Sequence, residues 1–231
     1  MKLIFALQDP SNPNSLAMRM RRARAQWIKD LITRIAAAEG RCRILDLGGE
    51  PAYWNLFDRA FLEASKVHVT LVNPMAFTVD DPLFTAAQDD ACELSQYEDG
   101  AFDLVHSNSV IEHVGEWSRM EAFAREARRL APSYYVQTPY FWFPIEPHFS
   151  TPFFHWRPEQ ARARALMRRS LGFAERATDL GDAMRIVETC KLLDKTQFQF
   201  LFPDGRHVDE RVVGLTKSLI AIRHGRDSLP N

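Results

Sequence analysis

Short apolar segments alternate with helix-like segments through the middle of this chain, and this alternation constrains its fold more than any other feature. Five segments rich in branched and aromatic residues are predicted to be strands: residues 42–47, 67–72, 83–88, 102–107 and 134–138. Between most of them, apolar residues recur at the three- and four-residue spacing of a helix with one buried face. Strands and helices that alternate in this way form a parallel sheet covered on both faces.

The alternation stops after the fifth strand. Two further strands, near His207–Val213 and Ser218–Arg223, are too close in sequence for a helical crossover, so we expect them to pair antiparallel. The predicted fold is therefore α/β: a Rossmann-like, doubly wound, mostly parallel seven-stranded sheet with a C-terminal antiparallel strand pair. We expect a single domain over residues 1–231, with an N-terminal amphipathic helix over 15–39 and an inserted substrate cap over 140–190.

Composition narrows the class of protein. The chain carries 29 Lys and Arg against 30 Asp and Glu, so we expect no nucleic-acid partner. Cys42, Cys92 and Cys190 lie far apart and have no histidine at zinc-site spacing, so we expect free thiols and no metal. No segment approaches the about 20 apolar residues of a membrane span. We therefore expect a soluble, cytoplasmic protein.

Glycine and polar residues follow several of the predicted strands. In a doubly wound sheet, ligands bind at the carboxyl ends of the strands, where the strand order reverses. The first strand ends in Asp46-Leu47-Gly48-Gly49, the second at Asn73 and the fourth in Ser107-Asn108, while Asp90 follows the third. The turn after the first strand is not the G-x-G-x-x-G dinucleotide motif, because Glu50 follows and the third glycine is absent. A carboxylate there would also repel a pyrophosphate.

These residues resemble motifs of the class I S-adenosylmethionine-dependent methyltransferases. Residues 44–49, Ile-Leu-Asp-Leu-Gly-Gly, look like the first motif of that family, and Asp90-Ala91 looks like its adenine-side motif. Residues 99–114 are similar to the fourth-strand block of the group that includes the ubiquinone/menaquinone methyltransferases. The resemblance covers residues 40–140 and implies S-adenosyl-L-methionine as the cofactor, with in-line transfer of its methyl group.

By this resemblance, Asp46 and the two glycines line the methionine part of the cofactor, and Asp90 meets the adenine amino group. Asn73 stands where the family usually has an acidic residue that holds both ribose hydroxyls. An asparagine can still donate and accept hydrogen bonds, but it lacks the stronger, charge-assisted bond. The cofactor-binding residues implied by the resemblance are Asp46, Gly48, Gly49, Glu50, Asn73, Asp90, Ala91 and Asn108.

The segment after the fifth strand is expected to bind the methyl acceptor. Residues 138–148 combine aromatic side chains with a few polar groups, as small-molecule pockets do; a hydrophobic cap that only buries the sheet edge is the alternative. We expect a small-molecule, lipid-linked or glycan-linked acceptor. The arginine-rich segment 157–169 either docks such an acceptor, contacts a membrane surface or faces solvent. The predicted substrate-binding residues are Tyr140, Trp142, Glu146 and His148.

A general base is needed only if the acceptor must lose a proton. His113 and His148 are the predicted catalytic residues because histidine titrates near neutrality, and Glu112 and Glu146 are second choices.

Two other functions are compatible with the sequence. A non-catalytic S-adenosylmethionine-binding or regulatory protein of the same fold would explain Glu50 and Asn73, whereas a nicotinamide-dependent oxidoreductase is disfavoured by the missing glycine.

Overall fold

A mixed sheet of seven strands forms the centre of the computed structural model, which describes residues 15–225. The strand order is β3-β2-β1-β4-β5-β9-β8; β1 to β5 are parallel, and β9 runs antiparallel to both β5 and β8. This confirms the predicted fold. The strands are β1 (Cys42–Leu47), β2 (Val67–Asn73), β3 (Phe84–Gln88), β4 (Leu104–Asn108), β5 (Ser133–Pro139), β8 (Arg206–Val212) and β9 (Leu215–Arg223).

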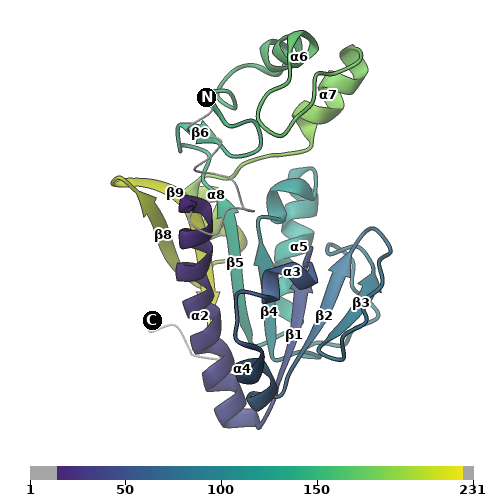
Figure 1. Ribbon diagram of the computed structural model, residues 1–231, viewed down its shortest axis with the longest axis vertical. Helices are drawn as coiled ribbons and strands as arrows, with labels where there is room; N and C mark the ends of the chain where they lie inside the picture. Colours follow the sequence, from purple (N-terminus) through teal and green to yellow (C-terminus); the bar gives the residue numbers. More distant parts are fainter. Residues whose placement is uncertain (1–14, 226–231) are drawn as a thin grey trace.

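Helices cover both faces of this sheet (Figure 1). One face packs against α2 (Leu16–Glu39), α3 (Pro51–Trp54) and α4 (Arg59–Ala64). The other packs against α5 (Trp117–Arg129) and α8 (Lys195–Leu201), with the short 3-10 helix η1 (Ile111–His113) between β4 and α5. Successive residues of a strand point to opposite faces, so each buried strand supplies apolar side chains to both layers.

The long helix α2 begins and ends at residues suited to those positions. The Ser15 hydroxyl accepts a hydrogen bond from the Met18 N–H (3.1 Å), and Gly40 ends the helix in the left-handed conformation at φ +70°. Ile28 and Ile32, one turn apart, are buried against the sheet. None of the helices in residues 15–225 is long and apolar enough to cross a membrane.

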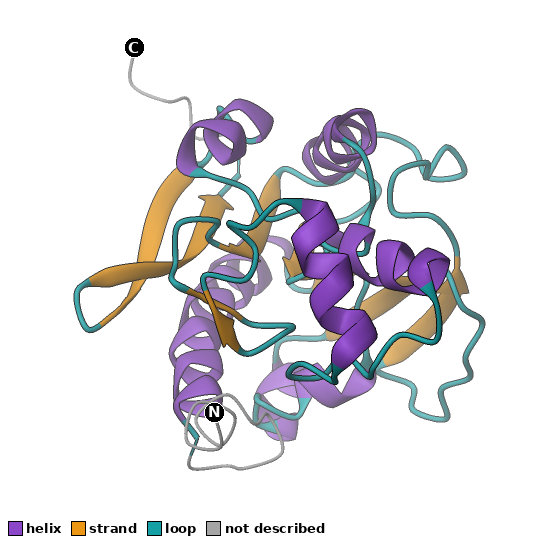
Figure 2. Ribbon diagram, turned by 90° about the horizontal axis from the view of Figure 1, so that it is seen from above, coloured by secondary structure: helices purple, strands orange, loops and turns teal. Residues whose placement is uncertain are grey.

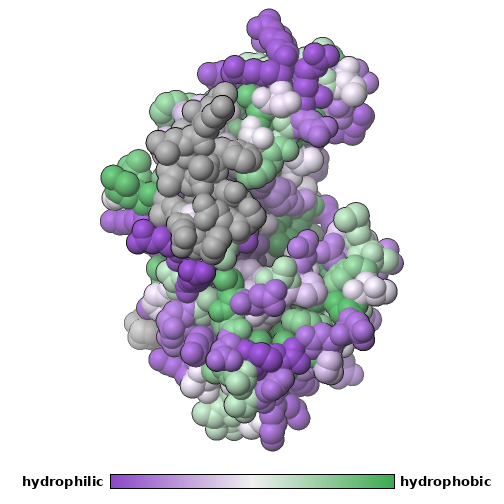
Figure 3. All heavy atoms as spheres, viewed as in Figure 1, coloured by the Kyte–Doolittle hydropathy of each residue, from purple (hydrophilic) through white to green (hydrophobic). Residues whose placement is uncertain are grey.

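The chain between β5 and α8 forms a cap, residues 140–190, at the carboxyl end of the sheet. It contains β6 (Ile145–Glu146), β7 (Thr151–Pro152), α6 (Glu159–Arg168) and α7 (Leu180–Glu188), and it has an apolar cluster of its own. Seen from above, its helices lie over the sheet end (Figure 2). The molecular surface is hollowed between the cap and the body of the molecule (Figure 3).

A buried carboxylate connects the elements beneath this hollow. Asp46 of β1 is 1% exposed; its Oδ2 accepts a hydrogen bond from Trp54 Nε1 (2.9 Å), and its Oδ1 lies 2.6 Å from Nδ1 of His106. The Tyr53 and Tyr135 rings pack on the His106 imidazole, with ring centroids 4.6 and 5.8 Å away. Asp46 thereby fixes β1, α3, β4 and β5 relative to one another.

Replacing Asp46 should test this anchor. Asp46→Ala leaves two buried donors without an acceptor, so we expect the free energy of unfolding to fall by about 2–5 kcal/mol. Asp46→Asn keeps one acceptor oxygen, so its free energy of unfolding should fall by less. Urea unfolding followed by circular dichroism measures both changes. The control is Glu63→Ala, which removes an exposed ion pair with Arg59 and should cost less than about 1 kcal/mol; an equally small effect of Asp46→Ala would contradict the anchoring role.

Candidate functional site

The carboxyl ends of the central strands form one continuous rim. The Gly48 N–H donates a hydrogen bond to the carbonyl of Val72 at the end of β2 (2.8 Å), and the Asp89 N–H donates to the carbonyl of Asn73 (3.0 Å). These bonds join the end of β1 to that of β2 and the end of β2 to the segment after β3. The structure therefore places Gly48 and Asn73 on neighbouring strand ends of the same edge.

The turn after β1 requires both of its glycines. Gly48 has φ +70°, a left-handed conformation that favours glycine, and a Cβ there would lie 2.6 Å from Val110 Cγ2. A Cβ on Gly49 would lie 2.1 Å from Asp46 Oδ2. We expected Asp46 to line the methionine part of a cofactor. In the structure, its carboxylate lies behind the turn and is bonded to Trp54 and His106, so it positions the turn.

Other rim residues offer hydrogen-bonding groups with few protein partners. Asn108 Oδ1 is buried and has no hydrogen-bond partner among the residues described. Within residues 15–225, Asn73 Oδ1 accepts only a long bond, 3.5 Å, from the Met75 N–H. The Glu50 side chain is exposed and does not cap α3, and Ala91 packs against the apolar core on the α5 side. These oxygen atoms can accept hydrogen bonds, so they fit a cofactor that carries amino and hydroxyl groups. They do not form the set of donors that a phosphate group needs.

Asp90 is engaged by an arginine that sequence reasoning did not identify. Both of its carboxylate oxygens accept hydrogen bonds from Arg119 of α5 (2.7 and 2.8 Å), and Oδ1 also accepts one from the Cys92 N–H (2.9 Å). Burial alone would raise the pKa of Asp90, but the bonds from Arg119 and Cys92 outweigh it, so the pKa is lowered. A carboxylate has about four lone-pair sites, so Asp90 retains acceptor capacity for an amino group.

A cavity of about 230 Å³ opens beside the rim, between α2, the ends of β4 and β5, the start of β9 and the cap. Two of the four predicted substrate-binding residues, Tyr140 and His148, line it. Its wall combines apolar and polar side chains: Arg21, Arg24, Asn108, Ser109, Gln137, Pro139, Tyr140, Phe143, Ile145, Pro147, His148, Phe173, Lys217 and Ser218.

The other two predicted substrate-binding residues lie outside this lining. Trp142 is 56% exposed and packs edge-on against Phe141, with ring centroids 4.9 Å apart. Glu146 is buried, and its carboxylate accepts hydrogen bonds from His148 Nδ1 (2.5 Å) and from the Phe149 N–H (2.6 Å). In the structure, Glu146 therefore holds the loop between β6 and β7 in place.

Three cationic side chains line the cavity. Arg24 is paired with Glu210, whose carboxylate oxygens lie 2.8 and 3.0 Å from Arg24 Nη1. The Lys217 ammonium contacts Met20 Sδ (3.5 Å), and within residues 15–225 neither Lys217 nor Arg21 forms an ion pair with a carboxylate. Burial lowers the pKa of Lys217 and of Arg21, and the positive charge of Arg24 lowers both further, while the Glu210 carboxylate offsets part of this effect at Lys217. Among the described residues, these three cations and the Glu210 carboxylate leave this part of the cavity with a net positive charge.

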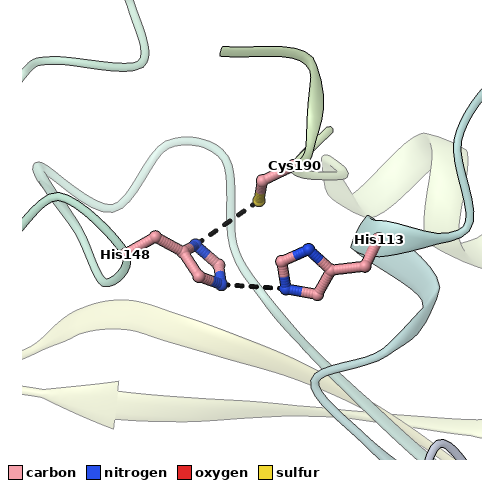
Figure 4. Close-up of side chains that lie close together, drawn as sticks. All are labelled: His113, His148 and Cys190. Carbon is pink, nitrogen blue, oxygen red and sulfur yellow. Dashed lines mark hydrogen bonds between the residues drawn. The ribbon is translucent and has the colours of Figure 1, made fainter. Parts of the chain in front are cut away.

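The two predicted catalytic histidines meet although they are 35 residues apart. Nε2 of His113, in η1, lies 3.0 Å from Nε2 of His148, in the loop after β6. Cys190 Sγ lies 3.4 Å from His148 Nδ1, and all three side chains point toward one another (Figure 4). His113 Nδ1 is 2.7 Å from the Thr189 carbonyl oxygen, to which it donates. The Nε2 atoms that a general base would use are thus directed at each other.

Buried carboxylates surround this pair. Glu112, 1% exposed, accepts a hydrogen bond from the Thr138 hydroxyl through Oε2 (2.9 Å), and burial raises the pKa of Glu112 to about 7. Burial lowers the pKa of His113. At His148 burial acts in the same direction, but the Glu146 carboxylate outweighs it and raises the pKa. Burial and the two carboxylates raise the pKa of the Cys190 thiol.

Sequence reasoning missed Cys190, Arg119 and Lys217 as members of these sites. Each meets its neighbours across a large sequence separation, such as the 42 residues between Cys190 and His148. Residues so far apart in the sequence form no local motif whose spacing would predict that they meet. The sequence does carry one signal for the charge of the cavity, a group of arginines in the N-terminal helix that includes Arg21 and Arg24.

Comparison with known proteins finds similarity to methyltransferases over part of the chain. Residues 53–133 match the family described as a methyltransferase domain. No curated protein matches the chain. A similar solved structure is the N-methyltransferase NodS from Bradyrhizobium japonicum in complex with S-adenosyl-L-homocysteine, which is 13% identical, with 98% of this chain and 96% of that chain covered and a TM-score of 0.48.

Two further solved structures are similar at the same level. The 1,6-didemethyltoxoflavin-N1-methyltransferase of Burkholderia thailandensis is 13% identical, with 95% of this chain and 92% of that chain covered and a TM-score of 0.48. The PH0226 protein of Pyrococcus horikoshii is 17% identical, with 94% and 97% covered and a TM-score of 0.46. The residues that match a methyltransferase domain run from α3 to the first residue of β5, so the match covers about a third of the chain and includes the parallel strands β2, β3 and β4.

Proposed function

We propose that the protein methylates a small organic acceptor that carries an anionic group, such as a carboxylate or a phosphate. The observation that carries this proposal is the pair of cations, Arg21 and Lys217, in the wall of a largely apolar cavity beside the rim. Both groups are partly buried, and within residues 15–225 neither forms an ion pair with a carboxylate, so an anionic ligand there would offset their partial desolvation. The lipid-linked and glycan-linked acceptors fit this chemistry only through an anionic group of their own.

We place the cofactor along the rim, on the acceptors that its strand ends present. The methionine part lies beside the turn at Gly48 and Asn108, the ribose at Asn73, and the adenine at Asp90 and Ala91. Bound there, S-adenosylmethionine supplies an electrophilic methyl group. Support comes from Asn108 Oδ1, which has no hydrogen-bond partner among the described residues, and from the weakly bonded Asn73 amide.

Asn108 belongs both to the rim and to the cavity wall, so it marks the boundary at which donor and acceptor would meet. The residues of the cavity then act by positioning: Tyr140, Phe143 and Ile145 exclude water from the acceptor, while the cations fix its orientation. Holding two reactants in line in a dry site supplies much of the rate of such a transfer. A protein that only bound the cofactor would not need this second cavity.

Asn73→Asp tests the placement of the ribose. A carboxylate would form a charge-assisted bond to the hydroxyls, so we expect about 1 kcal/mol tighter binding of S-adenosylmethionine, or roughly fivefold in affinity. Isothermal titration calorimetry measures this change. The control is Asn55→Asp, which adds the same charge at an exposed position that ends α3 and should leave the affinity unchanged. Unchanged or weaker binding by Asn73→Asp would place the ribose elsewhere.

Arg21→Met and Lys217→Met test the nature of the acceptor. The probe is a panel of aromatic and aliphatic carboxylic acids with their neutral amides, assayed for methyl transfer from labelled S-adenosylmethionine. We expect the wild type to prefer the acids, and each variant to raise their KM about tenfold or more through the loss of a charged hydrogen bond. Arg22→Met, at an exposed position of the same helix, is the matched control and should behave as the wild type.

Two outcomes would contradict the anionic acceptor. One is equal use of acids and amides by the wild type. The other is an unchanged preference for acids in the double variant of Arg21 and Lys217, which would mean that neither cation faces the acceptor.

A further inference from the structure

The facing nitrogens of His113 and His148 require a cation between them. His148 Nδ1 donates to the Glu146 carboxylate, and His113 Nδ1 donates to the Thr189 carbonyl. A neutral imidazole carries one N–H, so both Nε2 atoms then hold lone pairs, and these lie 3.0 Å apart. Two lone pairs at this distance repel each other unless a cation lies between them, either a shared proton or a metal ion.

Buried carboxylates beside the pair favour a cation at this position. Glu112 and Glu146 are both buried, and in the described part of the chain neither forms an ion pair with a lysine or an arginine. Glu112 Oε1 is a buried carboxylate oxygen without a hydrogen-bond partner among the residues described. A divalent ion bound by the Cys190 thiolate keeps one net positive charge, the same as a shared proton, so either cation would offset one of the two carboxylates.

The donor set identifies the kind of ion. One donor atom from each of His113, His148 and Cys190 lies within 4.8 Å of those from the other two. We propose that these three residues bind a divalent transition-metal ion of the Zn²⁺ type, through the two imidazole Nε2 atoms and the Cys190 thiolate. Imidazole and thiolate are the ligands that zinc prefers, and a site with three protein ligands leaves a fourth position open.

The distance between the two nitrogens requires only a small shift. Zinc–nitrogen bonds of about 2.0–2.1 Å in a tetrahedral site separate two nitrogens by roughly 3.4 Å, and the two Nε2 atoms now lie 3.0 Å apart. Glu146 on His148 Nδ1 and the Thr189 carbonyl on His113 Nδ1 are the outer partners that metal-binding histidines usually have. Binding would release the Cys190 thiol proton to solvent, since zinc is held by the thiolate.

Such an ion would tie the cap to the body of the molecule. His113 follows β4 at the sheet end, whereas His148 and Cys190 belong to the cap, and His148 also lines the acceptor cavity. With both Nε2 atoms bound to a metal, neither histidine would be free to act as a general base. Metal binding itself does not rest on the proposed acceptor, so it can be tested without any methyl transfer.

The experiment uses the full chain, stripped of metal with a chelator and reloaded with Zn²⁺ or Co²⁺. We expect one equivalent of zinc to remain after dialysis, measured by elemental analysis, and a higher Tm for the loaded protein. The cobalt form should show the near-ultraviolet charge-transfer band of a thiolate–cobalt bond. Cys190→Ser should abolish this band. Glu146→Gln should weaken zinc binding about 10- to 100-fold, because the His148 ring would lose the carboxylate that orients it.

Two controls separate this site from incidental binding. His68→Ala, at an exposed position of β2, should bind zinc as the wild type does. Cys92→Ser, which removes a buried thiol outside the cluster, should keep the cobalt band. The proposal is overturned if the wild type retains no stoichiometric zinc, in which case the two histidines share a proton. It is also overturned if the thiolate–cobalt band persists in Cys190→Ser.

Discussion

The buried Asp46 carboxylate is the interaction on which the geometry of this site depends. It binds Trp54 and His106 from two different elements, so its burial is compatible with stability only while both hydrogen bonds are made. The same carboxylate occupies the space that a Cβ on Gly49 would need. One side chain thus sets the position of β4 beside β1 and also the path of the glycine turn at the rim.

Two ligand environments of different character adjoin this turn. The rim presents neutral or anionic acceptors, among them Asn73, Asn108 and Asp90, which suits a cofactor with amino and hydroxyl groups. The cavity beside it has apolar walls and the cations Arg21 and Lys217. The opposite electrostatic character of the two sites would let a cationic cofactor and an anionic acceptor bind side by side without competing for the same surface.

The sequence was sufficient to predict the sheet, because strands and helices leave a local periodic signal. Residues 42–47 form β1 as expected, whereas the fourth strand begins at Leu104 and not at Phe102. The carboxylate of Asp103 is bonded to Arg43 of the neighbouring strand, and this is a tertiary contact that no local pattern contains. The strand ends that carry the rim residues were predicted for the same local reason.

The side-chain contacts could not be predicted in this way. His113 and His148 were selected separately, each as a possible base, and nothing in their spacing indicates that their Nε2 atoms meet or that Cys190 joins them. Trp142 and Glu146 were assigned to the substrate from composition alone, yet one is exposed and the other anchors a loop. Composition identifies a segment that can form a pocket, but packing decides which of its residues line that pocket.

The central claim is that this rim binds the methyl donor, and calorimetric titration of the wild-type protein tests it most directly. S-adenosylhomocysteine and S-adenosylmethionine should each bind at a single site, while NAD⁺ and NADH should give no binding heat, because the turn lacks the third glycine and carries Glu50 at the start of α3. Binding of the nicotinamide nucleotides in place of S-adenosylhomocysteine would contradict the account.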